Sequence, residues 1–373
     1  MKKLFALAAC TSIFVAGSAA HSAEVKLGYL LPLSGGGAEY GQRQLKGATL
    51  ALDEFKATNS GITIKFITSD TKCVPVEASN AAERLVERDG VDLMIGGTCS
   101  PEATASLRVT QKAKVPQIVP AAAATSITEE GNQFVFRIVP NTKQIAEHLA
   151  DVLADKIKVK SIATVYLNDD FGIDLNTNLV KRIESKGVKV VAQEGIERTV
   201  MDFFSTVAKL KPLAPEMVVA PLFNKPAAQL ARTMREQGMN VPVSDTIMLT
   251  DEFHQLAGAA AYGSIQTTFF HATGKSPLGQ SFVERFKAKY PGEIPGNFEA
   301  EGYDAATLAI DAFKRAGADK AVSREAITKA LRETKDFVGV MGPINFDAKG
   351  QVAAPDSKFT LIRNEQGTLK AVD

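Results

Sequence analysis

The residues best suited to chemistry in this chain form the segment Thr98-Cys99-Ser100-Pro101-Glu102. Pro101 suits the first turn of a helix, so the segment predicts a helix N-terminus with Ser100 beside it. A hydroxyl together with the free backbone N–H groups of a helix start can bind a carboxylate. The same hydroxyl can instead only cap its own helix, and both interpretations stay open. A nucleophilic role is disfavoured because the chain has no G-x-S-x-G motif and no histidine near Ser100 in sequence.

Two other kinds of segment offer binding groups. The alanine-rich segment 120–125 has side chains small enough for a ligand to reach backbone C=O and N–H groups, or for two lobes to pack tightly. Phe171 and Phe223 are expected in equivalent loops further along the chain. There they can cover an apolar ligand or pack into a core, and both roles stay open.

Phosphate, metal and cofactor sites are not predicted. The glycine-rich segment 32–37 matches neither G-x-G-x-x-G nor a Walker motif, so it favours a βα turn. Asp169, Asp170 and Asp174 favour solvated turn charges over a Ca²⁺ or Mg²⁺ site, because no recognisable metal loop surrounds them. The four histidines show no ligand spacing.

Alternating strand and helix patterns must position these residues. Strands are expected at 25–30, 62–67, 91–95, 117–119, 161–166, 188–192 and 217–220. Helices are expected at 42–56, 75–89, 102–112, 142–155, 174–186, 203–211, 226–237, 281–290, 300–315 and 324–333. A restart near 134–140 divides the chain into two successive α/β units, and a hairpin is expected from about 342 onward. Parallel sheets bind ligands beyond their carboxyl strand ends, so two facing lobes predict a cleft.

Residues 1–23 predict a secretory signal peptide. A positively charged start precedes an apolar stretch over residues 4–16, and small residues follow. The apolar stretch is too short to cross a bilayer, which takes about 20 apolar residues. Cleavage after Ala20 and after Ala23 both stay open, and lipid attachment at Cys10 is the less favoured alternative. We therefore expect an exported protein in the periplasm.

Length and charge limit the partners of the mature chain. About 350 residues remain after the leader, which is too long for one ordinary core and indicates two domains. The whole chain has 43 Lys and Arg against 42 Asp and Glu, and removal of Lys2 and Lys3 leaves 41 against 42. No basic cluster is visible, so nucleic acid is not an expected partner.

Two cysteines, Cys73 and Cys99, remain after the leader. An even number in an exported chain favours one disulfide, which closes a loop of roughly 26 residues and contributes about 3 kcal/mol. Two unpaired buried thiols are the alternative. A metal site is disfavoured because no histidine lies near the thiols in sequence.

An ordered set of short motifs resembles the periplasmic solute-binding proteins of ABC transporters, type I, of the branched-chain amino-acid (leucine/isoleucine/valine)-binding family. Each motif is weak alone, but together they cover nearly the whole mature chain in the family's order. They are Leu33-Ser34-Gly35 with Glu39-Tyr40-Gly41, Gly47-Ala48, Asp70 with Cys73, Gly96 with Cys99-Ser100, Val115-Pro116 before Pro120-Ala121-Ala122, Asp170-Phe171-Gly172, Asp202-Phe203-Phe204, Gly302-Tyr303-Asp304-Ala305, and Gly342-Pro343-Ile344-Asn345-Phe346-Asp347 with Gly350.

The resemblance implies an α/β fold of two Rossmann-like lobes joined by three crossings of the chain. Lobe 1 would contain residues 24–140 and 271–358, and lobe 2 would contain residues 141–270 and 359–373. The family also has a disulfide that matches the two cysteines of this chain.

The resemblance assigns the carboxylate end of the ligand site. The family's serine after the second cysteine, which binds the α-carboxylate, matches Ser100. Its P-A-A-T loop matches Ala121 and Ala123. The family threonine is missing here, and Ala123 offers only backbone.

The remaining site residues implied by the resemblance are aromatic or acidic. Tyr40 is kept, whereas Phe171 and Phe223 stand where branched-chain binders have tyrosine. The family's ammonium-binding glutamate falls near Asp245-Thr246. Of these two, only Asp245 can supply a charge, so the α-amino contact departs more from the family than the carboxylate contact does.

The implied function is solute binding for an ABC importer rather than catalysis. The ligand would pass to a membrane permease, with no cofactor, and the protein is expected to be monomeric. An aliphatic amino acid is the first ligand class, and an aromatic or other organic carboxylate is the second. A ligand sensor for a membrane receptor has the same fold and stays an alternative. An exported enzyme is disfavoured because no base accompanies any nucleophile.

Overall fold

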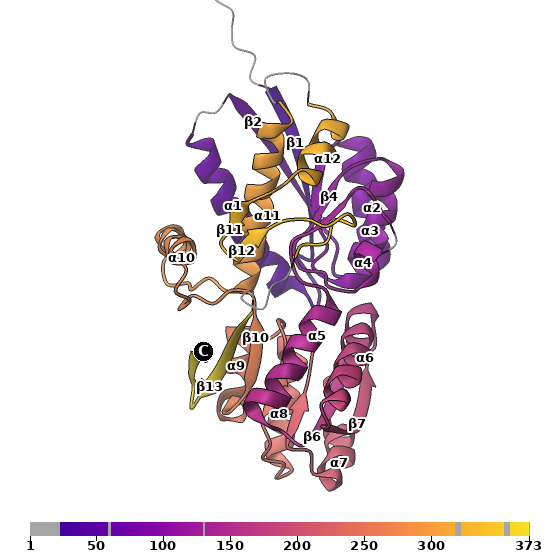
Figure 1. Cartoon of the computed structure of the whole chain (residues 1–373), viewed down its shortest axis with the longest axis vertical. Helices are drawn as coiled ribbons and strands as arrows, with labels where there is room; N and C mark the ends of the chain where they lie inside the picture. Colours follow the sequence, from indigo (N-terminus) through magenta and orange to yellow (C-terminus); the bar gives the residue numbers. More distant parts are fainter. Residues whose placement is uncertain (1–22, 59–60, 130, 318–321, 354–358, 373) are drawn as a thin grey trace, which may run out of the picture.

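The computed structural model describes residues 23–372 except 59–60, 130, 318–321 and 354–358. The predicted signal peptide lies outside the described residues, apart from Ala23. Two helix-covered sheets lie end to end along the long axis of the molecule (Figure 1). This arrangement confirms the predicted α/β fold of two lobes. No helix among the described residues is long and apolar enough to cross a membrane.

The first sheet is parallel throughout and has the order β2-β1-β3-β4-β5. Its strands are β1 (Ala23–Leu31), β2 (Ile62–Asp70), β3 (Leu93–Gly96), β4 (Gln117–Val119) and β5 (Val135–Arg137). The strands β3, β4 and β5 are short and fully buried, as expected for a parallel sheet covered on both faces, although β4 carries the polar Gln117 and β5 the charged Arg137. We call this sheet with its helices lobe 1.

The second sheet has the order β14-β13-β10-β9-β8-β6-β7. Its strands are β6 (Ser161–Leu167), β7 (Lys189–Ile196), β8 (Met217–Val219), β9 (Val243–Asp245), β10 (Ile265–Thr268), β13 (Thr360–Glu365) and β14 (Thr368–Val372). The pairs from β10 to β7 are parallel, whereas β13 and β14 form an antiparallel hairpin at the edge. We call this sheet with its helices lobe 2.

Each helix packs in one of the two lobes defined by the sheets. Lobe 1 holds α1 (Ala38–Lys56), α2 (Pro75–Glu83), α3 (Ser100–Lys112), α4 (Ser126–Glu129), α10 (Pro277–Lys289), α11 (Asn297–Arg315) and α12 (Arg324–Arg332). Lobe 2 holds α5 (Thr142–Asp151), α6 (Asp170–Ser185), α7 (Phe204–Leu210), α8 (Asn224–Glu236) and α9 (Asp251–Ala257). The chain therefore passes between lobes after β5, after β10 and before β13. The predicted lobe boundaries at residues 140, 270 and 358 stay predictions.

A close crossing of α1 and α11 fixes the part of lobe 1 that faces lobe 2. A Cβ atom at Gly47 would lie 1.9 Å from the backbone oxygen of Glu299, and one at Gly302 would lie 2.0 Å from that of Gln44. Only glycine permits this approach of two backbones. The crossing matters for the site because the N-terminal turns of α1 and α11 carry side chains that face the other lobe.

The hairpin expected from residue 342 is present in part, since the chain turns at residues 347–350 and Phe346 pairs antiparallel with Val352. The segment Gly342–Ile344 is a strand, β12, but it pairs backward with β11 (Phe337–Gly339). The alternating segment near 360 instead pairs with β10 in lobe 2. The sequence showed the local alternation, but the partner of each strand depends on the tertiary fold.

Candidate ligand-binding site

A cavity lies between the two lobes at the carboxyl ends of their strands. Its enclosed volume is about 30 Å³, and about 440 Å³ is free of protein atoms when the space that opens to solvent is included. Residues from both lobes line it: Tyr40, Thr98, Cys99, Ser100, Ala121, Ala122, Ala123, Leu167, Asp169, Phe171, Arg198, Phe223, Ile247, Met248 and Phe298. Its position agrees with the rule that α/β sheets bind ligands beyond the carboxyl ends of their strands.

Six of the eight residues predicted as ligand contacts line this one cavity. They are Tyr40, Ser100, Ala121, Ala123, Phe171 and Phe223. Asp245 and Thr246 do not belong to the lining, and the wall after β9 is formed by Ile247 and Met248. The structure thus gathers six of the predicted residues, and a ligand-binding role for all eight stays a prediction.

Ser100 is the first residue of α3 and is almost completely buried. Its Oγ accepts a hydrogen bond from the backbone N–H of Ala124, at 3.1 Å, in the loop after β4. Ser100 therefore links two loops, and the bond favours a hydroxyl whose O–H remains available to donate. The first turn of α3 adds backbone N–H groups and a positive dipole end on the same side.

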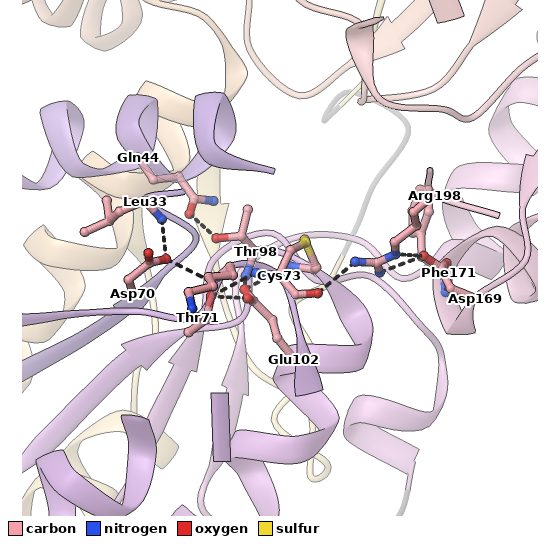
Figure 2. Close-up of a disulfide and its surroundings, with 12 residues drawn as sticks. Leu33, Gln44, Asp70, Thr71, Cys73, Thr98, Glu102, Asp169, Phe171 and Arg198 are labelled. Atoms are coloured by element: carbon pink, nitrogen blue, oxygen red, sulfur yellow. Dashed lines mark hydrogen bonds and ion pairs between the residues drawn. A yellow bond between two sulfur atoms is a disulfide. The ribbon is translucent and has the colours of Figure 1, made fainter. Parts of the chain in front are cut away.

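The first turn of α3 includes Glu102, which is buried beneath the loop (Figure 2). Its carboxylate accepts the N–H groups of Thr98, at 2.7 Å, and Cys99, at 3.1 Å, and also the hydroxyl of Thr71. Burial raises the pKa of Glu102, and these hydrogen bonds act against the rise. Because Cys99 rather than Ser100 is the N-cap residue of α3, the hydroxyl of Ser100 does not serve as the cap.

The predicted disulfide between Cys73 and Cys99 is confirmed, with Cα atoms 5.6 Å apart. It joins the turn after β2 to the residue before α3. Cys73 has φ of +63°, so the crosslink holds a backbone conformation that non-glycine residues seldom adopt. Nearby, Oδ1 of Asp70 accepts the N–H of Leu33 at 2.8 Å and anchors the glycine-rich segment that follows β1.

Aromatic rings from both lobes form the apolar part of the cavity. The ring of Tyr40 lies 4.4 Å from that of Phe298 and 5.6 Å from that of Phe223, between centroids. The hydroxyl of Tyr40 also accepts the backbone N–H of Asn224 in lobe 2, at 3.1 Å. Tyr40 therefore lines the cavity and also makes a hydrogen bond between the lobes. Phe171 supplies a further ring from the first turn of α6.

Arg198 is the main lining residue that the sequence did not predict. Its Nε and Nη2 contact Oδ2 of Asp169 at 2.9 and 2.7 Å, and its Nη1 donates to the backbone oxygen of Cys73 at 2.8 Å (Figure 2). The guanidinium carbon lies 5.7 Å from the ring centre of Phe223. Arg198 follows β7 by two residues, so the strand-end rule could have found it.

The acidic residues after β6 have separate partners. Oδ1 of Asp169 accepts the N–H groups of Phe171 and Gly172, both at 3.0 Å, and so caps α6. Asp174 accepts the N–H and the hydroxyl of Thr125, each at 2.7 Å, which ties α6 to the alanine-rich loop of lobe 1.

Asp245 is completely buried at the end of β9. Burial raises the pKa of Asp245 to about 8, although backbone N–H groups of Thr246, Leu249 and Met248 act in the opposite direction. The carboxyl is therefore largely neutral at pH 7. The hydroxyl of Thr246 lies 3.4 Å from Oδ1 of Asp245.

A second set of polar contacts joins the lobes beside Tyr40. Glu39 in α1 accepts the hydroxyl of Thr250, at 2.7 Å, and a side-chain N–H of Asn224. A hydrogen bond with Glu39 and burial raise the pKa of Glu252 to about 7. Burial alone would raise the pKa of Glu39, but hydrogen bonds from Glu252, Thr250 and Asn224 and the charge of Arg43 lower it overall. One proton is thus shared by two carboxyl groups across the lobes.

Comparison with known proteins agrees with this geometry. Residues 24–367 match the family described as periplasmic binding protein. An amino acid binding protein of Pseudomonas aeruginosa is 30% identical over 95% of this chain and 95% of its own.

Two solved structures share the fold over nearly the whole chain. A branched-chain amino acid transporter substrate binding protein from Streptococcus pneumoniae, in complex with isoleucine, has a TM-score of 0.86 and 25% identity over 94% of this chain and 99% of its own. A solute binding protein of an ABC transporter from R. palustris, in complex with benzoate, has a TM-score of 0.86 and 24% identity over 94% and 95% of the two chains.

The family match, the two-lobed fold and the cavity between the lobes lead to one assignment. Members of this family bind solutes and are not enzymes, which agrees with the prediction from sequence. The chain belongs to the type I periplasmic binding proteins, in the leucine/isoleucine/valine-binding family of ABC-transporter solute-binding proteins.

Proposed function

We propose that this protein binds a small carboxylate with an apolar body in the cavity between its lobes and delivers it to the membrane permease of an ABC importer. The observation that carries the proposal is the cavity itself. One side presents Ser100 and the start of α3, and four aromatic rings from both lobes supply much of the apolar wall. Such a combination of a few placed polar groups and apolar walls is typical of small-molecule sites.

Ligand capture is coupled to the approach of the lobes. Contacts such as Arg198 to Cys73 and Asn224 to Tyr40 join residues of different lobes beside the cavity. A ligand that touches both lobes binds the closed arrangement better than an open one and so favours closure. Release to a permease then requires only reopening.

The two ligand classes expected from sequence both fit this description. The relative from P. aeruginosa is named an amino acid binding protein, and the S. pneumoniae protein was crystallised with isoleucine. Both support an amino acid. The phenylalanines at 171 and 223 and the burial of Asp245 favour the second class, an organic carboxylate with an apolar body.

Thermal-shift screening of the mature protein tests the proposal. Amino acids and aliphatic and aromatic acids are added one at a time at millimolar concentration. We expect at least one small carboxylate to raise the melting temperature, since a ligand that binds only the native state stabilises it. Stabilisation by none of them contradicts the proposal.

Location and partner are tested separately. The leader predicts that the protein is found in a periplasmic extract, and the importer role predicts loss of uptake of the identified ligand when the gene is deleted. Unchanged uptake at low ligand concentration would favour the sensor alternative instead.

A further inference from the structure

The charges of the cavity are already paired with one another. Among the described lining residues, Asp169 and Arg198 are the charged ones. Both oxygens of Asp169 are engaged, Oδ1 by the two N–H groups that begin α6 and Oδ2 by Arg198. The side chain of Asp169 is only 11% exposed. Asp169 is therefore not a free acceptor for a positively charged ligand group.

Asp245, the other acid expected near the ligand, is not positioned to replace Asp169. It does not line the cavity, and the segment that follows it contributes the apolar side chains of Ile247 and Met248. Its carboxyl is completely buried behind this apolar segment, so an ammonium group in the cavity does not meet it directly.

Donors, in contrast, remain available on the disulfide side of the cavity. The hydroxyl of Ser100 has an O–H to give. Among the described residues, three of the five N–H donors of Arg198 are engaged, which leaves two. Cys73, to which Arg198 is bound, is crosslinked to Cys99, the neighbour of Ser100 (Figure 2). The guanidinium of Arg198, the hydroxyl of Ser100 and the N-terminus of α3 therefore all lie near the Cys73–Cys99 disulfide.

Such an end of the cavity favours one kind of ligand. A carboxylate receives charge-assisted hydrogen bonds there. An α-ammonium group, which is one carbon away from the carboxylate, would be desolvated beside a guanidinium with no free carboxylate to face it. Burying a charge without a partner is strongly unfavourable.

We propose that the ligand is a carboxylate without an α-ammonium group, such as a 2-oxo acid or another aliphatic or aromatic organic acid, and that Arg198 is the residue that determines this preference. This inference rests on the proposed function, because it concerns the class of carboxylate that occupies the same cavity. It assigns Arg198 a direct role in holding the carboxylate end with Ser100.

Matched pairs of ligands test the preference. Leucine and 4-methyl-2-oxopentanoate share a carbon skeleton and differ at C2, where an oxo group replaces the ammonium group and the hydrogen. Phenylalanine and 3-phenylpropanoate differ only in the ammonium group. Calorimetric titration of the mature protein at pH 7 should give at least about tenfold tighter binding for the acid without the ammonium group in the pair that fits. Equal or tighter binding of the amino acids overturns the inference and leaves the proposed function standing. Binding of no carboxylate overturns both.

Substitutions distinguish the effect of the Arg198 charge from the effect of its contact with Asp169. Arg198→Gln should weaken binding of the preferred acid about tenfold or more. It should also reduce the difference in affinity between the acid and the amino acid of each pair. The single variant Arg198→Gln leaves Asp169 without its cation. The double variant Asp169→Asn/Arg198→Gln, which removes both charges, is therefore compared with the single variant. Asparagine can still cap α6, so a fully folded double variant with the same narrowed difference supports the inference.

Two controls complete the experiment. Arg182 also pairs with an aspartate of lobe 2, Asp151, but lies outside the cavity lining, so Arg182→Gln should change neither affinity nor preference. Asp245→Asn should likewise leave the difference within each pair unchanged. Loss of amino-acid binding in Asp245→Asn would identify Asp245 as an ammonium acceptor and overturn the inference.

Discussion

Ser100 shows how a single hydroxyl can serve two loops and a ligand. Its Oγ accepts the N–H of Ala124, while Glu102 accepts the N–H groups of Thr98 and Cys99 just before the helix. A side chain held in this way loses little freedom when a ligand arrives, which favours binding.

Replacing Ser100 by alanine should therefore weaken carboxylate binding by about 1–3 kcal/mol, because a buried oxygen of the ligand loses its donor. Calorimetric titration measures the change. Ser106→Ala is the matched control, since Ser106 lies buried in the same helix and bonds to Ala103 and Gln117 away from the cavity. It should lower stability but leave affinity unchanged, and an equal loss of affinity in both variants would remove Ser100 from the site.

Among single residues, the sequence predicted those whose own segment has the pattern of a strand end or a helix start. Ser100, Phe171 and Phe223 each lie four residues after the end of a strand and at or next to the start of a helix. Arg198 escaped because the turn after β7 carries no motif, and only the folded chain brings it to Cys73. Phe298 escaped because α11 begins at residue 297, earlier than its apolar periodicity shows.

The elements around the cavity depend on tight backbone packing more than on apolar periodicity. Tyr40 lies near the N-terminus of α1 and Phe298 near that of α11, and the crossing through Gly47 and Gly302 sets their positions. Alanine has a higher helix propensity than glycine, so propensity alone would favour alanine at both places. Packing overrides it here.

Gly47→Ala should lower the free energy of unfolding by about 1–3 kcal/mol because its methyl group would overlap the backbone oxygen of Glu299. Chemical denaturation measures this, and ligand affinity should fall as well because the two aromatic rings shift. Gly36→Ala is the control for stability, since its Cβ meets only ordinary contacts, 3.8 and 3.9 Å from the ring of Phe223. A Gly47→Ala variant as stable as the wild type would show that the helices separate freely.

The elements that the sequence did not predict include β5, α4 and α9 and the two short polar strands β9 and β10. The strands β9 and β10 have the sequences VSD and IQTT, which carry neither an apolar run nor a clear alternation. They are strands because their neighbours supply the hydrogen bonds, so their existence follows from the sheet rather than from local preference. The longer apolar strands and most helices were predicted close to their observed bounds.

The whole molecule is held closed by contacts that respond to its surroundings. Glu39 and Glu252 share a proton between the lobes, and Thr250 and Asn224 complete the group. Other charges nearby are those of Arg43, Asp251 and Lys225.

This shared proton predicts a pH dependence of ligand affinity. The pKa of Glu252 is raised in the closed form, so its contribution to closure is complete below the ordinary carboxyl pKa and is lost as pH rises through about 7. The lowered pKa of Glu39 acts in the opposite direction at acidic pH. We expect affinity to fall several-fold between pH 6 and pH 8.5. In Glu252→Gln the fall in affinity should be smaller. Calorimetric titration at three pH values measures the affinity of the wild type and of the variant. Glu333→Gln, an exposed site, should behave as the wild type, and identical curves for all three would contradict the prediction.

The disulfide also acts at this scale, because the oxygen of Cys73 anchors Arg198 of the other lobe. The variant Cys73→Ser/Cys99→Ser should lose about 3 kcal/mol of stability, as expected for a loop of this length. Affinity should fall too. Adding Arg198→Gln to this variant should then cost less affinity than it does in the wild type, since the two changes act on one contact. Simple addition of the two losses would show that they are independent.

The interleaved order of the two lobes has a consequence for how the polypeptide is made. Lobe 1 lacks α11 until residue 315 has been synthesised, and β10 lacks its neighbour β13 until residue 365 has been added. Neither half can therefore complete its fold before nearly the whole chain has been made.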